Sequence, residues 1–189
     1  MGLLGEGINE VIATTSGNAA PIGIICRDAV PRMVLFRGSH TAENVLRDGW
    51  IVANFVYDPV VWVRTAFEDL PAEAFRTEAV DGTSVQRLVD AEAWIAFAAE
   101  VERSTQEAHV VRLTLLREAV EDLRLHPVNR GFASIIDATV HATRYVRTGD
   151  PHLRRLIDHH ASLVRKCGGR REWEALDLLQ GYIAKQAPE

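Results

Sequence analysis

The sequence of 189 residues is poor in cysteine, with only Cys26 and Cys167, which are far apart and form no Cys-x-x-Cys pair. A disulfide framework and a cysteine-based zinc site are therefore disfavoured, and this cysteine count suits a reducing cytoplasm. No stretch approaches the ~20 apolar residues that cross a bilayer. The N-terminus is acidic from Glu6 and is not typical of a secretory signal. We therefore expect a cytoplasmic protein without a membrane partner.

Positive charge is also scarce. The 21 lysines and arginines are outnumbered by 26 acidic residues, which gives a net charge of −5 and a pI of about 5.8. This balance does not favour nucleic acid as a partner. The contents of 47% hydrophobic and 25% charged residues are those of a globular chain, and the length suits one domain or a domain with an appendage.

Several motifs of catalytic and phosphate-binding proteins are missing. The sequence has no Walker loop, no Gly-x-Gly-x-x-Gly dinucleotide element and no Gly-x-Ser-x-Gly nucleophile elbow. The seven histidines form no His-Glu-x-x-His motif. His152 and His159 lie about two helical turns apart, too far to ligate one metal together. We therefore expect no metal site, and the sequence names no catalytic side chain.

Short β-branched and apolar segments, separated by turn residues, fill the sequence up to about residue 120. This pattern indicates antiparallel strands of a barrel or a sandwich. The expected strands are 8–14, 19–26, 33–36, 50–56, 91–102 and 108–118. The alanines and glutamates of residues 91–102 would also suit a helix. Residues 70–85 carry a poor signal apart from a turn at Asp81-Gly82.

Helical signals are of two kinds. Two short helices interrupt the strands, one over residues 42–47 with Thr41 as its cap and one over 60–68 with Asp58 as its cap. After Pro127 the apolar residues recur three and four positions apart, which predicts three helices. These helices cover residues 132–146, 151–167 and 171–185. The sequence thus predicts an α+β fold, with a β-barrel domain over residues 1–125 and a three-helix domain over 126–189.

A candidate phosphate site lies between the third strand and the first short helix. Arg37 and Gly38 end the strand, and Ser39 and Thr41 begin the helix. A helix N-terminus offers unpaired N–H groups and a partial positive charge, which favour a phosphate. The two hydroxyls add donors, and Arg37 adds a full charge. On these residues alone, an ordinary strand, turn and capped helix without a ligand is the favoured interpretation.

The segment Asn18-Ala19-Ala20-Pro21-Ile22-Gly23 is a candidate site for a planar ring. Small residues let a ring lie against a strand backbone, whose polar groups can bind the edge of the ring. A proline inside a strand indicates an edge or a bulge. An irregular edge strand without a ligand explains the same residues.

The order and spacing of these two segments resemble the FMN-binding split barrel of the flavin reductase type. That superfamily has an Asn-x-x-Pro strand and then a Ser-x-Thr-x-x-Asn loop that holds the flavin phosphate. The matching residues are Asn18, Pro21, Ser39, Thr41 and Asn44, followed by Asn54 in the next strand. Residues 9–15, 18–23 and 141–144 further resemble an uncharacterised archaeal and bacterial family that joins such a barrel to a helical C-terminal domain.

The resemblance implies an FMN cofactor and a set of cofactor-binding residues. These are Thr14, Thr15, Asn18, Ala19, Ala20, Pro21, Ile22, Arg37, Ser39, His40, Thr41, Asn44, Asn54 and Arg144. His40 departs from the lysine or arginine that flavin reductases commonly have before the loop threonine. Because neutral histidine brings no full charge, Arg37 or Arg144 would have to neutralise the phosphate.

The resemblance also implies an FMN-dependent oxidoreductase of unknown substrate. It would form a homodimer with FMN at the subunit interface and would use NAD(P)H as a transient partner. A non-catalytic FMN-binding or interaction module is the alternative. A split barrel that has lost flavin and binds another phosphorylated ligand is a third reading.

Overall fold

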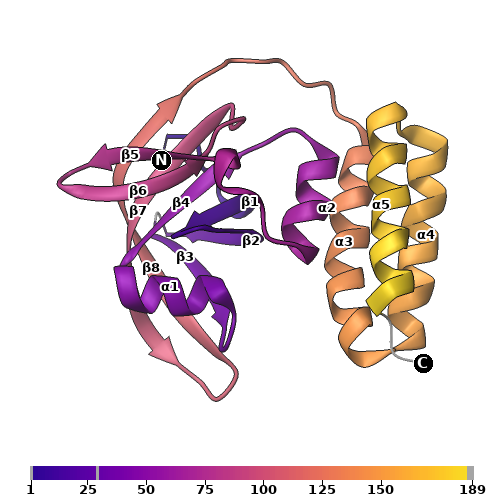
Figure 1. Ribbon diagram of the computed structural model, residues 1–189, viewed down its shortest axis with the longest axis horizontal. Coiled ribbons are helices and arrows are strands. Elements are labelled where there is room, and N and C mark those ends of the chain that lie inside the picture. The colour runs from indigo at the N-terminus through magenta and orange to yellow at the C-terminus, as the bar shows by residue number, and fades with distance from the viewer. Residues whose placement is uncertain (1, 29, 187–189) are drawn as a thin grey trace. The chain divides into compact units, whose positions relative to one another are not determined.

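The computed structural model describes residues 2–28 and 30–186 (Figure 1). Contacts between residues divide the chain into two compact units. The first comprises the residues up to Val56 together with 69–124, and the second comprises 57–68 together with the residues from Leu125 onward. The domain division at residues 125 and 126 stays a prediction, and the second unit of the structure includes residues 57–68 as well.

Six antiparallel strands form a closed barrel in the order β1-β2-β3-β8-β7-β4. Their bounds are β1 Gly7–Thr15, β2 Asn18–Arg27, β3 Val30–Phe36, β4 Trp50–Phe55, β7 Ala93–Ser104 and β8 Ala108–Val120. The predicted α+β fold with a six-stranded barrel is confirmed. The segment that also suited a helix is strand β7, which pairs with both β4 and β8. These long-range ladders outweigh the helix propensity of its alanines.

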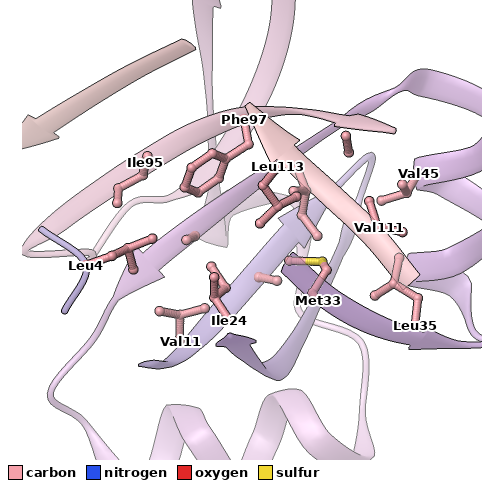
Figure 2. Close-up of a cluster of buried hydrophobic side chains, with 14 of the residues drawn as sticks. Leu4, Val11, Ile24, Met33, Leu35, Val45, Ile95, Phe97, Val111 and Leu113 are labelled. Atoms are coloured by element: carbon pink, nitrogen blue, oxygen red, sulfur yellow. The ribbon is translucent and has the colours of Figure 1, made fainter. Parts of the chain in front are cut away.

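The barrel interior is apolar (Figure 2). Alternation along β8 directs Val111 and Leu113 inward, where they are 0% and 3% exposed. From other strands Val11, Ile24 and Phe97 join the same cluster. Each such side chain contributes about 1.5–3 kcal/mol through burial, so this cluster fixes the register of the strands around it.

A hairpin that the sequence pattern did not predict lies in the same unit. A 3₁₀ turn at Ala72–Ala74 leads into β5 Phe75–Val80 and β6 Thr83–Leu88. The expected Asp81-Gly82 turn joins these strands, with φ of 46° and 79°. Most hairpin side chains are exposed or half-buried, and Val80 and Val85 are buried against Trp50 and Trp94. Because few of its positions are apolar, the hairpin shows little periodicity in the sequence.

The second unit is a bundle of α2 Pro59–Phe67, α3 Arg130–Thr148, α4 Pro151–Cys167 and α5 Arg170–Gln186. Asp58 caps α2 as expected, and it also forms an ion pair with Arg171 of α5 at 2.7 Å. The three expected C-terminal helices are confirmed, and α2 packs against α3 and α5. No helix in the described part of the chain is long and apolar enough to cross a membrane.

Candidate functional site

Helix α1, His40–Asp48, follows β3 through a tight turn in which Gly38 has a φ of 75°. Ser39 is the residue that caps this helix: its Oγ accepts from the backbone N–H of Ala42 at 3.2 Å and donates to the Phe36 carbonyl at 2.8 Å. The expectation that Thr41 caps the helix is therefore wrong. Thr41 lies inside the first turn and is 4% exposed. The helix begins earlier because Ser39 has the extended backbone that a cap requires.

The N-terminus of α1 keeps donors for a ligand. The N–H of Ala42 uses the Ser39 hydroxyl, and the N–H of Glu43 uses the Ser39 carbonyl at 3.1 Å. The N–H groups of His40 and Thr41 come earlier in the first turn, where a helix supplies no acceptor of its own. Together with the positive end of the helix dipole, they form a site suited to an anion.

Hydrogen bonds join α1 to the turn between β1 and β2. Asn18 donates from Nδ2 to the Thr41 hydroxyl at 2.9 Å. Asn44 donates to the Thr15 hydroxyl at 2.9 Å and to the Ser16 carbonyl at 3.1 Å. The structure thus brings together the two segments that the sequence analysis selected separately.

A carboxylate completes this junction. The Ser16 hydroxyl donates to Asp48 at 2.7 Å, and Arg47 pairs with the same side chain at 2.6 Å. Hydrogen bonds from Arg47 and then from Ser16 lower the pKa of Asp48. The ionised carboxylate therefore holds the turn at the C-terminal end of α1.

The first residues of β2 have an open edge. Residues 18–26 pair with β1, whereas β3 pairs with β2 only through Ile25, Cys26 and Arg27. Within the described strands, the second edge of residues 18–24 has no ladder partner. Ala20, Pro21 and Ile22 are half-buried there, and Ala19 is 5% exposed. Small side chains beside unpaired backbone groups give a surface to which a flat heterocycle can bind.

Thr14 and Asn54 point into the protein and are both 0% exposed. Asn54 donates to the Thr14 hydroxyl at 3.0 Å and accepts from the N–H of Leu88 at 2.8 Å. Thr14 in turn donates to the Gln86 carbonyl at 2.6 Å. These two predicted residues join β1 and β4 to β6 in this structure.

The predicted cationic residues occupy three different places. Arg37 is exposed and donates from Nε to the Thr105 carbonyl at 2.8 Å. The His40 side chain is 69% exposed, and its Nδ1 lies 4.0 Å from Asp69. Arg144 is exposed on α3 in the second unit. Arg37 thus lies just before α1 and His40 is its first residue, whereas Arg144 belongs to the other unit.

Three site residues were missed from the sequence: Ser16, Asp48 and Gln86. Ser16 and Asp48 lie in turn signals, which mark a bend without indicating a partner. Gln86 accepts from the N–H of Gly17 at 2.6 Å through its side-chain oxygen. It lies in the hairpin whose pattern was weakest, so no sequence signal pointed to it. No group of three or more potential metal-ligating side chains occurs among residues 2–28 and 30–186.

Comparison with known proteins shows the family. Residues 9–122 match the N-terminal domain, and residues 129–181 the C-terminal part, of a family described as protein of unknown function (DUF447). The chain belongs to the DUF447 family. The predicted resemblance to an uncharacterised family of split-barrel proteins is confirmed.

A crystal structure of an FMN-bound DUF447 protein from Methanosarcina mazei is similar to this chain over almost its whole length. The two are 40% identical with a TM-score of 0.89, and the match covers 94% of this chain and 96% of the other. An uncharacterized protein of Methanocaldococcus jannaschii is 38% identical over 66 residues, which are 33% of this chain and 34% of that protein. The 2-nitrobenzoate 2-nitroreductase of Pseudomonas fluorescens is 18% identical with a TM-score of 0.47, over 64% of this chain and 68% of the other.

Proposed function

We propose that this protein is an FMN-binding flavoprotein. The hydrogen bond from Asn18 to Thr41 carries the proposal, because it joins the open-edged strand to the helix N-terminus. A flavin mononucleotide needs both features, a flat surface for its ring and an anion site for its phosphate. The FMN-bound relative from Methanosarcina mazei, at 40% identity, supports this choice of ligand.

In this proposal the start of α1 binds the phosphate. The donors are the Thr41 hydroxyl and the N–H groups of His40 and Thr41. The Ser39 hydroxyl joins them when it exchanges its bond to the Phe36 carbonyl for one to the phosphate, and Asn44 holds the helix in place. Arg37 supplies the full charge, because it lies between the end of β3 and the start of α1. Its Nε donates to the Thr105 carbonyl, which leaves the Nη groups of the guanidinium for the phosphate.

The ring lies against residues 18–22 in the same proposal. The open edge of β2 presents backbone groups to the polar edge of the ring, and Ala19 and Ala20 leave room for it. Thr15 helps to fix the turn beside the ring. Asn54 and Thr14 do not contact the ring in this proposal. Asn54 donates to the Ile12 carbonyl and to the Thr14 hydroxyl, and these bonds hold the β1 strand that leads into the turn.

We further propose that the protein is an oxidoreductase of unknown substrate. Bound flavin supplies hydride and electron transfer, and the residues of this chain bind and orient it. Anaerobic addition of NADH or NADPH tests the activity. Bleaching of the visible flavin absorbance supports an oxidoreductase with a transient nicotinamide partner. An unchanged spectrum with both donors supports the non-catalytic FMN-binding module.

The proposal includes a homodimer in the cytoplasm, with the flavin at the subunit interface. Exposed apolar side chains on neighbouring strands favour an interface, with Phe36 57% and Val34 41% exposed on β3 and Leu115 55% exposed on β8. A stable dimer of this kind buries about 1,200–2,000 Å² in total. Light scattering at micromolar concentration measures the mass, and a monomer would contradict this part.

The identity of the ligand is tested directly. The purified protein should be yellow, and heating should release a compound with the absorbance spectrum and the mass of FMN. Release of a colourless phosphorylated compound would instead support a barrel that has changed its ligand. A protein that purifies empty and does not bind added FMN would contradict the proposal.

A further inference from the structure

Gln86 of β6 contacts the β1–β2 junction at two points. Its backbone carbonyl accepts from the Thr14 hydroxyl at 2.6 Å. Its side-chain Oε1 accepts from the backbone N–H of Gly17, also at 2.6 Å. Gly17 has a φ of 66° and directly precedes Asn18, the first residue of the strand proposed to carry the ring. Gln86 thus contacts the turn at Gly17, whereas Asn44 contacts it at Thr15 and Ser16.

The contact with Gly17 fixes how the amide of Gln86 is oriented. A backbone N–H can only donate, so the oxygen of the amide must face Gly17 and the nitrogen must face away. In the part of the chain that the structure describes, this Nε2 has no protein acceptor. The side chain is half-buried. Two N–H donors of the Gln86 amide are therefore available next to Gly17, the residue that precedes the ring segment.

We propose that Gln86 is a further ligand-binding residue of this site. Its Oε1 fixes the turn at Gly17, and its Nε2 donates to a carbonyl oxygen of a planar heterocycle that lies against residues 18–22. This inference rests on the proposed flavin function, because the isoalloxazine ring has such carbonyl oxygens on its polar edge. Gln86 is the contribution of the β5–β6 hairpin to the site.

The position of β6 does not depend on the Gln86 side chain. Leu88 donates its N–H to Asn54, and the Thr14 bond uses the Gln86 carbonyl, which any residue supplies. The buried Arg87 also pairs with Glu78 at 2.9 Å and with Glu121 at 3.4 Å. Substitutions of the Gln86 side chain should therefore leave the fold intact.

Two variants separate the two roles of the side chain. Gln86→Ala removes both the acceptor and the donors. Gln86→Glu keeps an oxygen for the N–H of Gly17 but replaces the Nε2 donors with an anionic oxygen. Ser84→Ala is the matched control, because Ser84 is exposed, lies two positions earlier and so faces the same side of β6. The measurements are FMN affinity by fluorescence titration and the midpoint potential of the bound flavin.

We expect Gln86→Ala to lose FMN affinity by about threefold to tenfold, and Ser84→Ala to match the parent. Gln86→Glu should also bind FMN more weakly and should shift the midpoint potential to more negative values, because a carboxylate near the ring disfavours the reduced anion. A Gln86→Glu protein with unchanged affinity and potential would overturn the donor role. Unchanged affinity in Gln86→Ala would overturn the whole inference, and a parent that binds no FMN would overturn the proposed function with it.

Discussion

Asn44 of α1 donates to the hydroxyl of Thr15 at the end of β1, with 2.9 Å between Nδ2 and Oγ1, although the two residues are 29 positions apart in the sequence. Both side chains are buried, at 9% and 1% exposed. The same amide also reaches the Ser16 carbonyl at 3.1 Å. The Asn44 side chain therefore helps to hold α1 against the β1–β2 turn.

Asn44→Ala should destabilise the protein by about 1–3 kcal/mol, because it leaves the buried Thr15 hydroxyl and the Ser16 carbonyl without this donor. Urea unfolding measures the change through the midpoint at constant slope. Glu43→Gln is the control, since Glu43 is exposed on the same turn and should change stability by no more than about 0.5 kcal/mol. An Asn44→Ala protein as stable as the parent would contradict this role.

The double variant Ser39→Ala, Thr41→Ala should lose FMN affinity by at least about tenfold, because two phosphate donors disappear. Since Ser39 also caps α1, stability should fall by about 0.5–2 kcal/mol as well. Riboflavin lacks the phosphate and separates the two effects. Its affinity should differ little between variant and parent, and equal losses for both ligands would place the phosphate elsewhere.

Ala20→Leu tests the position of the ring. Ala20 is half-buried on the open-edged part of β2, so a large side chain there should obstruct a ring lying against the strand. Overpacking costs about 1–3 kcal/mol of stability, which a folded barrel can withstand. The variant should fold and purify without stoichiometric flavin, as judged by circular dichroism and absorbance. A folded variant that keeps its FMN would contradict the placement of the ring and leave the phosphate site untouched.

The helical unit should lose stability in mild acid. Burial, and then the nearby His160, lower the pKa of His141, with Asp137 opposing them. The unfolded chain therefore binds a proton more readily than the folded one between that lowered pKa and the ordinary value of about 6.5. The stability that the neutral His141 provides is fully present above about pH 6.5, and it is lost as the pH falls below that value.

His141→Gln should flatten this pH dependence, because no proton is then taken up at this position on unfolding. The measurement is the urea midpoint of parent and variant at a series of pH values from neutral to mildly acidic. The two proteins are compared by how steeply the urea midpoint changes with pH. A loss of stability that is the same at every pH does not change this slope. Parallel curves for the two proteins would rule out His141 as the source.

The sequence alone determined the parts of this protein that local patterns encode. Alternating apolar residues such as Val111 and Leu113 predicted barrel strands, and caps such as Asp58 and Asp150 predicted helices. These features need only neighbouring residues, because a strand face or a capped helix is specified within one segment. The family resemblance likewise depended only on the chain itself, because it rests on the order and spacing of Asn18, Pro21, Ser39 and Thr41.

Only the tertiary structure decided which distant groups meet. The β5–β6 hairpin is stabilised by contacts of Val80 and Val85 with the barrel's tryptophans, so its own sequence shows little periodicity. The role of Gln86 depends on that hairpin reaching Gly17, 69 residues away. The sequence predicted Thr41 as the cap of α1, whereas the structure has Ser39 in that position. The hairpin and the Gln86 contact depend on long-range packing, which a local sequence pattern does not encode.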